Sequence, residues 1–191
     1  VSTPIDVGCG VCSRCVPACP TGAIVKDGVI DANKCLSWLL QKPGIFDRDY
    51  RIALHDRIYG CDDCQTVCPP TRRTELSEST EQLQSIVEVL TWLSMDDESL
   101  NASCQRWYVH QRDMTWIRRN LLIVLGNIAE PSNPDVVDAI RTYASHSRSE
   151  LRAHAVWAAS RLGLSNLINH EDSDPMVREE LLHLPTLREG L

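Results

Sequence analysis

Over most of the chain, apolar positions recur at the spacing of one buried helix face. The first such run comprises Leu83, Ile86, Val87, Leu90 and Leu93. Capping residues mark three later helices. Asn133-Pro134 precedes a helix with apolar residues at Val136, Val137, Ile140 and Tyr143. Ser149 and Gly163 mark the start and the end of the next helix, and Asp174-Pro175 precedes the last one. No strand pattern competes here, so we expect an all-α region.

Before residue 72 the apolar runs are shorter. Residues 23–25 and 29–31 are predicted to form two strands of a hairpin that turns at Lys26-Asp27-Gly28. Residues 33–41 are predicted to form a helix that ends before Pro43-Gly44, and residues 48–59 a second helix that ends at Gly60. This part of the chain offers little apolar core.

Between the two regions, residues 71–80 are polar and show no periodicity. We therefore expect a small α+β domain over residues 1–72, a linker at 73–80 and an all-α domain over 81–191. Inside the latter, residues 118–128 match residues 152–162 at an offset of 34, and residues 174–178 resemble the start of a third unit. Such a period indicates stacked helix pairs of the HEAT-like repeat type, and a plain helical bundle is the alternative.

The composition places the chain among globular proteins. Of 191 residues, 43% are hydrophobic and 24% are charged. The longest uninterrupted apolar run, Leu121–Leu125, is far shorter than the roughly 20 residues of a membrane-spanning helix. Residues 1–6 lack the features of a signal peptide, so we expect a cytoplasmic protein without a membrane partner. Because the first residue is Val rather than Met, we also expect the sequence to continue a longer polypeptide.

Eight of the nine cysteines lie before residue 69, and they carry the candidate chemistry. They form C-x2-C-x2-C-x3-C-P, then a single cysteine, then C-x2-C-x3-C-P. The first motif is the signature of bacterial ferredoxins, in which three cysteines hold one [4Fe–4S] cluster and the fourth crosses to the other cluster. We therefore predict two clusters, the first held by Cys9, Cys12, Cys15 and Cys68 and the second by Cys19, Cys35, Cys61 and Cys64.

Two other interpretations of these cysteines are zinc, which suits paired C-x2-C elements, and disulfides, which suit small secreted domains. Three cysteines plus a crossing fourth fit neither well. Arg14 and Lys34 are candidates to balance the negative charge of the clusters, or they are ordinary solvated charges. We expect the remaining cysteine, Cys104, to be a buried free thiol rather than a reactive one.

Several segments resemble one enzyme family. They are Cys9-Gly10-x-Cys12 through Cys19-Pro20-Thr21-Gly22-Ala23-Ile24, Cys35-Leu36-Ser37-Trp38-Leu39, Arg57-Ile58-Tyr59-Gly60-Cys61-Asp62-Asp63-Cys64-Gln65, and the stretch from Arg118-Arg119-Asn120 to Gly126-Asn127. Together they resemble epoxyqueuosine reductase over nearly the whole chain, most closely in the cysteine-rich part.

The resemblance implies an activity and its cofactors. Members of that family are monomeric cytoplasmic oxidoreductases that use cobalamin to reduce epoxyqueuosine to queuosine in tRNA, while two [4Fe–4S] clusters pass electrons to the cobalamin. A flavodoxin or a ferredoxin is the expected electron donor. Their N-terminal domain supplies most of the cobalamin pocket and the acidic residue proposed as proton donor, and nothing in this chain corresponds to it. We therefore expect no catalytic residue here and no activity from this chain alone.

The resemblance also implies contacts to cobalamin. Ser37 matches a position that faces the cofactor, and Asp62, like Asp63, lies between two predicted cluster ligands. The alternatives are a helix-start hydroxyl and turn-forming aspartates. The chain departs from the family at Leu40-Gln41-Lys42, where a glutamate is missing, and at Pro69-Pro70-Thr71, where Pro-Trp-Asn is common. The missing glutamate weakens the comparison around the corrin.

The helical region is then expected to bind tRNA phosphates. The candidate residues are Arg112, Arg118, Arg119 and Arg152, with Arg148 in a related position. The net charge of −7 falls entirely on residues 76–191, so any basic surface must be local. The alternative is that these arginines bind neighbouring loop carbonyls. Trp92, Trp107, Trp116 and Trp157 are expected to pack between helices rather than stack on bases.

Two other functions fit the same residues. A stand-alone electron-transfer protein with two [4Fe–4S] clusters would use its helical repeats to dock a partner protein. A related cobalamin reductase would act on a small molecule, as dehalogenases do, although the helical repeats argue against it. We favour the iron–sulfur and tRNA-docking portion of an epoxyqueuosine reductase.

Overall fold

The computed structural model describes residues 10–72 and 85–188. Cys9, the predicted linker at 73–80 and Leu83 lie outside the described residues. Within those two ranges, no helix combines the length and the apolar character needed to cross a membrane.

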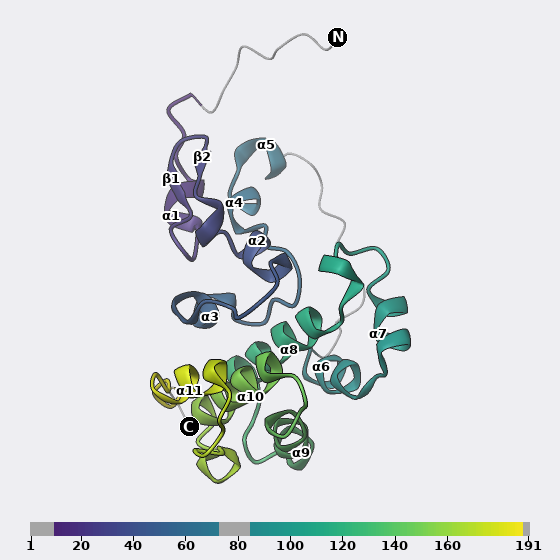
Figure 1. Cartoon of the computed structure of the whole chain (residues 1–191). Coiled ribbons are helices and arrows are strands. Elements are labelled where there is room, and N and C mark those ends of the chain that lie inside the picture. Colours follow the sequence, from purple (N-terminus) through teal and green to yellow (C-terminus); the bar gives the residue numbers. More distant parts are fainter. Residues whose placement is uncertain (1–9, 73–84, 189–191) are drawn as a thin grey trace.

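The N-terminal part consists of one β-hairpin among short helices (Figure 1). In chain order these elements are α1 (Cys15–Ala18), β1 (Ile24–Lys26), β2 (Val29–Ile30), the 3-10 helix η1 (Ala32–Lys34), α2 (Leu36–Gln41), α3 (Arg48–Leu54), α4 (Asp63–Thr66) and α5 (Pro69–Arg72). The two strands pair antiparallel, with Ile24 opposite Ile30, which confirms the predicted hairpin.

Two helices of this part are shorter than the sequence pattern predicts. The helix expected over residues 33–41 divides in two, because Cys35 adopts extended backbone angles after η1 and becomes the N-cap of α2. The helix expected over residues 48–59 ends at Leu54, because His55 takes a positive φ of 54° that a right-handed helix does not continue. The residues from His55 onward therefore form a loop that leads to Cys61.

In the C-terminal part, all regular elements among the described residues are helices. They are α6 (Ser85–Ser94), α7 (Asp97–Ser103), η2 (His110–Arg112), α8 (Thr115–Ile128), α9 (Pro134–Ala144), α10 (Ser149–Arg161), η3 (Ser165–Leu167) and α11 (Pro175–Leu181). The predicted caps at Asn133 and Asp174 are confirmed, since the side chain of Asn133 accepts from the Asp135 N–H and that of Asp174 from the Met176 N–H. The cap predicted at Ser149 is wrong, because Arg148 is the N-cap of α10 and Ser149 is already the first residue of the helix.

Helix α8 is the centre of the molecule. Its residues from Thr115 to Asn127 are all buried, and it packs against α6 and α10 as well as against α2 and α3. A Cβ atom on Gly126 would lie 2.5 Å from the Trp157 ring, so the glycine allows α8 and α10 to approach closely. The two segments that match each other in sequence are thus a packed helix pair, and α11 packs on α10.

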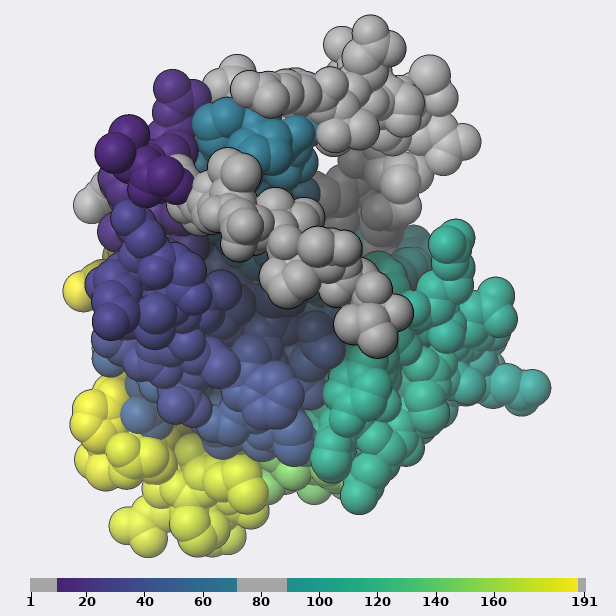
Figure 2. Space-filling view, turned by 90° about the horizontal axis from the view of Figure 1, so that it is seen from above, coloured from purple at the N-terminus to yellow at the C-terminus, as the bar shows by residue number. Residues whose placement is uncertain are grey.

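One hydrophobic core extends across the predicted domain boundary. Leu36, Leu39, Leu40, Phe46 and Leu54 belong to the same buried cluster as side chains of α6, α8, α9 and α10. In Figure 2 the N-terminal part, in purple and blue, lies over the helical part. The teal residues after residue 88 flank it on one side, and the yellow C-terminal residues flank it on another. The boundary at residue 72 stays a prediction, and the described residues on both sides of it pack together.

Buried polar side chains of α8 bind the backbone of the N-terminal part. Arg119 is 1% exposed and donates to four carbonyl oxygens at 2.7–3.2 Å, those of Leu39, Leu40, Lys42 and Gly44. Asn120 donates to the carbonyls of Leu40 and Ile58. Because the last carbonyls of a helix lack internal donors, these bonds complete the end of α2. They also attach α8 to the loop that leads to Cys61.

A second buried polar cluster joins α3 to α10 and α11. Arg51 and Glu180, both with side chains at 0% exposure, form an ion pair at 2.8 and 3.1 Å. The Phe46 N–H donates to Nε2 of His154, whose Nδ1 lies 2.6 Å from the Glu150 carbonyl oxygen. These partners select the neutral imidazole with its hydrogen on Nδ1. Burial, together with the charges of Arg51 and Arg119, holds the pKa of His154 well below its usual value.

Candidate metal centre

Short elements of the N-terminal part present the cysteines. Cys15 begins α1 and Cys19 follows it, Cys35 precedes α2, and Cys64 lies in α4. Seven of the eight predicted ligands are described, and each is partly exposed and free of disulfides. Cys9 lies outside the described residues. Helices of four residues are not stable alone, so packing and any bound cofactor must hold these cysteines in place.

Four of these cysteines line a single cavity. They are Cys19, Cys35, Cys61 and Cys64, and apolar side chains including Ala23, Ile24, Ile30 and Leu36 complete the wall. Among the described residues, no three Cys, His, Asp or Glu side chains converge closely enough to share one metal ion. Sulfurs distributed around a cavity fit a [4Fe–4S] cluster, because each of its four irons takes one thiolate. These four are the residues predicted to hold the second cluster.

Hydrogen bonds reach the sulfur of Cys19. The Ala23 N–H donates to it at 3.2 Å, and the Thr21 hydroxyl lies 3.6 Å away while donating to the Lys34 carbonyl at 2.6 Å. Burial acts to raise the pKa of Cys19, but hydrogen bonds from Thr21, Ala23 and Ile24 outweigh it and lower that pKa below the usual value. These hydrogen bonds stabilise the thiolate form of Cys19 relative to that of a free cysteine.

Cys61 and Cys64 lie in a different environment. Burial raises the pKa of both thiols. At Cys61 the charges of Asp63 and Cys35 act in the same direction, whereas Arg57 and the Asp63 N–H oppose them. Arg57 forms a two-pronged ion pair with Asp63, with its Nη2 at 2.7 and 2.8 Å from the carboxylate oxygens. The sequence showed this arginine only as part of a resembling segment, and its role depends on the loop after His55.

A second, more open cavity of about 450 Å³ adjoins the first. Ser37, Arg57, Tyr59, Gly60, Cys61, Asp62 and Gln65 line it. The structure thus brings together Ser37 and Asp62, the two residues predicted to face cobalamin, which are separated in sequence. The Tyr59 ring stacks on Trp107 with ring centres 4.6 Å apart, and its hydroxyl accepts from the Tyr108 N–H, so the helical part supports this wall.

The arginines predicted to contact tRNA have partners within the protein. Arg112, which is exposed, binds Asn101 and the Trp107 carbonyl. Arg118 binds Asp97 and the Met95 carbonyl, and Arg119 is enclosed by backbone carbonyls. These contacts match the alternative in which such arginines bind neighbouring loops. Arg119 has no exposed surface to offer a phosphate in this structure.

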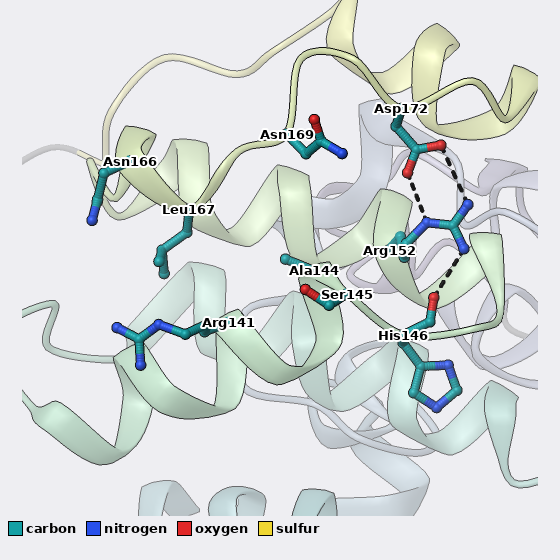
Figure 3. Close-up of a pocket in the computed structure, with 9 residues that line it drawn as sticks. All are labelled: Arg141, Ala144, Ser145, His146, Arg152, Asn166, Leu167, Asn169 and Asp172. Carbon is teal, nitrogen blue, oxygen red and sulfur yellow. Dashed lines mark hydrogen bonds and ion pairs between the residues drawn. The ribbon is translucent and has the colours of Figure 1, made fainter.

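Arg152 also lies in a network. Figure 3 shows its guanidinium turned toward Asp172 and the His146 carbonyl, at 2.7 and 2.9 Å. It lines an open cavity of about 550 Å³ together with Arg141 and His146. Its side chain is 18% exposed, so one edge still faces solvent.

The structure also shows the positions of the remaining residues that the sequence singled out. Cys104 is fully buried, as predicted, and Trp116 and Trp157 are buried between helices. Trp92 and Trp107 pack against the same core. Arg14 is exposed and Lys34 partly exposed, and both stay candidates to balance cluster charge.

Comparisons with known proteins agree with this geometry. Residues 8–71 match the family of 4Fe-4S double cluster binding domains. The epoxyqueuosine reductase of Vibrio cholerae serotype O1 is 35% identical over 167 residues, covering 83% of this chain and 43% of that protein. The epoxyqueuosine reductase of Bacillus anthracis is 32% identical over 169 residues, covering 84% and 43%. The chain is therefore homologous to epoxyqueuosine reductases over most of its own length.

A crystal structure shows the same relationship in three dimensions. An epoxyqueuosine reductase in complex with an epoxyqueuosine-modified tRNA-Tyr stem loop matches this chain with a TM-score of 0.77 and 25% identity, covering 95% of this chain and 50% of that one. The resemblance to epoxyqueuosine reductase is thus confirmed. The chain spans about half the length of the epoxyqueuosine reductases that it matches.

Proposed function

We propose that this chain is the electron-transfer and tRNA-docking portion of an epoxyqueuosine reductase, an oxidoreductase that reduces epoxyqueuosine to queuosine in tRNA through cobalamin. The observation that carries the proposal is the cavity lined by Cys19, Cys35, Cys61 and Cys64. Its four cysteines come from both motifs and from the single cysteine between them, as crossed ligation of two clusters requires.

In the proposed ligand sets, each cluster takes cysteines from both motifs. Cys19, Cys35, Cys61 and Cys64 would hold the second cluster, and Cys9, Cys12, Cys15 and Cys68 the first. Contact between α1 and α4, which carry or adjoin cysteines of both sets, supports two neighbouring clusters. Bound clusters would supply one-electron transfer, while the protein sets their potentials through charges and hydrogen bonds.

The open cavity beside Cys61 is the proposed cobalamin-facing surface. Ser37 and Asp62 offer a hydroxyl and a carboxylate there, and Tyr59 and Gly60 complete the wall. The cavity is open to solvent, so this chain would cover one side of a cofactor held mainly by another part of the enzyme. In this arrangement Ser37 orients the cofactor and Cys61 lies between it and the second cluster.

The helical part is the proposed tRNA-docking region, with α8 to α11 as HEAT-like repeats. The related structure with a bound tRNA stem loop supports this assignment. Of the four candidate arginines, Arg112 and Arg152 keep exposed edges, whereas Arg118 and Arg119 are buried in internal contacts. Phosphate contacts are therefore assigned to Arg112 and Arg152, and a structural role to the other two.

Iron binding provides the first test. Anaerobic reconstitution of the chain should give about eight iron atoms per chain, the content of two [4Fe–4S] clusters. A Cys35→Ala variant should lose about half of this iron, and Cys104→Ala, which removes a cysteine outside the motifs, should lose none. A chain that binds one zinc ion per site instead would contradict the proposal.

Binding of tRNA separates this function from that of a stand-alone electron carrier. The reconstituted chain should bind a tRNA anticodon stem loop with an affinity that falls as salt rises, and Arg112→Gln together with Arg152→Gln should reduce that salt dependence. Arg178→Gln removes a comparable exposed charge that does not line the cavity of Arg152, so it serves as a control for general electrostatics. Clusters without any tRNA binding would favour the electron carrier.

A further inference from the structure

Cys61 lies at the boundary between the two cavities of the metal centre. It lines the cavity of four cysteines and also the open cavity of Ser37 and Asp62. No other residue in the described part of the chain lines both of these cavities. An electron that leaves the second cluster toward a cofactor in the open cavity therefore has Cys61 on its shortest protein route.

One ion pair lies directly against this residue. Arg57 donates to both carboxylate oxygens of Asp63, at 2.7 and 2.8 Å, and the charges of both residues act on the Cys61 sulfur. Asp63 lines the cysteine cavity, whereas Arg57 lines the open one. Both side chains are about three-quarters buried, at 28% and 26% exposure, so solvent screens their charges only partly.

The pair is held on both sides. Arg57 also donates to the Leu54 carbonyl at the end of α3, and Asp63 begins α4. The ion pair therefore connects the end of α3 to the helix that carries Cys64, across the loop that ends at Cys61. A change in either charge acts on the position of Cys61 and on the electric field at its sulfur.

We propose that Arg57 and Asp63 act as a positioning pair whose opposite charges balance at the second cluster, so that loss of either charge alone shifts the one-electron reduction potential of that cluster. The inference rests on the proposed function, because it requires a cluster at Cys61. A cluster with four thiolates carries net negative charge, so adding an electron is favoured by a nearby cation and opposed by a nearby anion. Arg57 raises the potential, Asp63 lowers it, and the pair keeps the two effects in balance.

Potentials of single and double variants test this balance. A redox titration of the reconstituted chain, followed by electron paramagnetic resonance, should show one of two potentials shift to a lower value in Arg57→Gln and to a higher value in Asp63→Asn. The double variant should return close to the wild-type value, because both charges are then absent. Arg57→Lys keeps the cation and should stay nearer to wild type than Arg57→Gln. Arg141→Gln with Asp138→Asn removes a distant surface pair and should move neither potential.

The outcomes separate the inference from the function on which it rests. A fully loaded Arg57→Gln variant with unchanged potentials would overturn the inference alone, as would shifts of equal sign in Arg57→Gln and Asp63→Asn. If Arg57→Gln fails to hold iron, the potentials of Asp63→Asn and Arg57→Lys test the inference instead. An unchanged potential in Asp63→Asn would then overturn it. A wild-type chain that takes up no iron would overturn the proposed function and this inference with it.

Discussion

At the scale of single residues, buried guanidinium groups are used as structural donors. Arg51 pairs with Glu180, Arg118 with Asp97, and Arg119 with four backbone carbonyls. Burial lowers the pKa of Arg119 to about 9, yet its bonds to carbonyl oxygens compensate for much of the lost hydration. Each of these arginines holds a particular loop or helix end in place.

The buried pair of Arg51 and Glu180 gives a prediction about stability. Glu180→Gln leaves Arg51 charged, buried and without its carboxylate, so we expect the free energy of unfolding to fall by about 3–5 kcal/mol. Replacing both residues, as in Arg51→Met with Glu180→Leu, should recover most of this loss. Urea unfolding of the three proteins measures the difference. Equal losses in the single and the double variant would contradict the expectation.

His154 gives a prediction about pH. Its folded-state pKa lies well below 6.5, whereas the unfolded chain takes up a proton near that value, so stability is present above about pH 6.5 and is lost as the pH falls through it. His154→Gln should lower stability at pH 7.5 but flatten its dependence on pH between 7.5 and 5.5. His183→Gln, which changes a histidine with 56% exposure, is the matched control and should leave the slope unchanged.

At the scale of elements, two kinds of helix serve two purposes. The helices α1 and α4 have four residues each and carry or adjoin predicted ligands, so they depend on their surroundings for stability. By contrast, α8 and α10 have 14 and 13 residues and bury most of their surfaces. The short helices position the predicted cysteine ligands, and the packed pair of α8 and α10 supports them.

The contact between α8 and α10 gives a prediction at this scale. Alanine is favoured over glycine in a helix by about 1 kcal/mol, but a Cβ at Gly126 would lie 2.5 Å from the Trp157 ring. We therefore expect Gly126→Ala to destabilise the protein by about 1–3 kcal/mol. In a Trp157→Leu background the same change should cost much less. Thermal unfolding of the four proteins in this cycle tests the contact, and an equal cost in both backgrounds would argue against it.

At the scale of the whole molecule, the iron–sulfur part and the helical part are not independent. Their side chains share one hydrophobic core, and α8 supplies hydrogen bonds to the ends of α2 and α3. The geometry of the cysteines therefore depends on helices that are more than 50 residues away in the sequence.

This coupling predicts the behaviour of a cleaved chain. If a protease site is inserted at residues 73–80 and cut, the two fragments should elute together in gel filtration, because separating them would expose Leu39, Leu40 and Phe46 to water. Urea at a concentration below the unfolding midpoint should not release them. Fragments that elute separately without denaturant would show two independent domains.

Spacing of residues along the chain sufficed to predict the double-cluster domain, the hairpin, the helix caps at Asn133 and Asp174, and the resemblance to epoxyqueuosine reductases. Each of these depends on contacts between near neighbours in sequence, or on a motif whose geometry is local. The ends of the helices at Leu36 and Leu54 were predicted less well, because they depend on backbone angles at Cys35 and His55 that no spacing reveals.

Only the tertiary structure decided which charged residues point inward. Nothing in the local sequence distinguishes Arg119 from Arg112, yet one is buried against α2 and the other is exposed, because burial depends on which distant segment packs there. In the same way, Ser37 meets Asp62 in one cavity, and Arg57 meets Asp63 beside Cys61, through the turn that begins at His55. Motif spacing thus determined the candidate chemistry, and packing determined the charges that surround it.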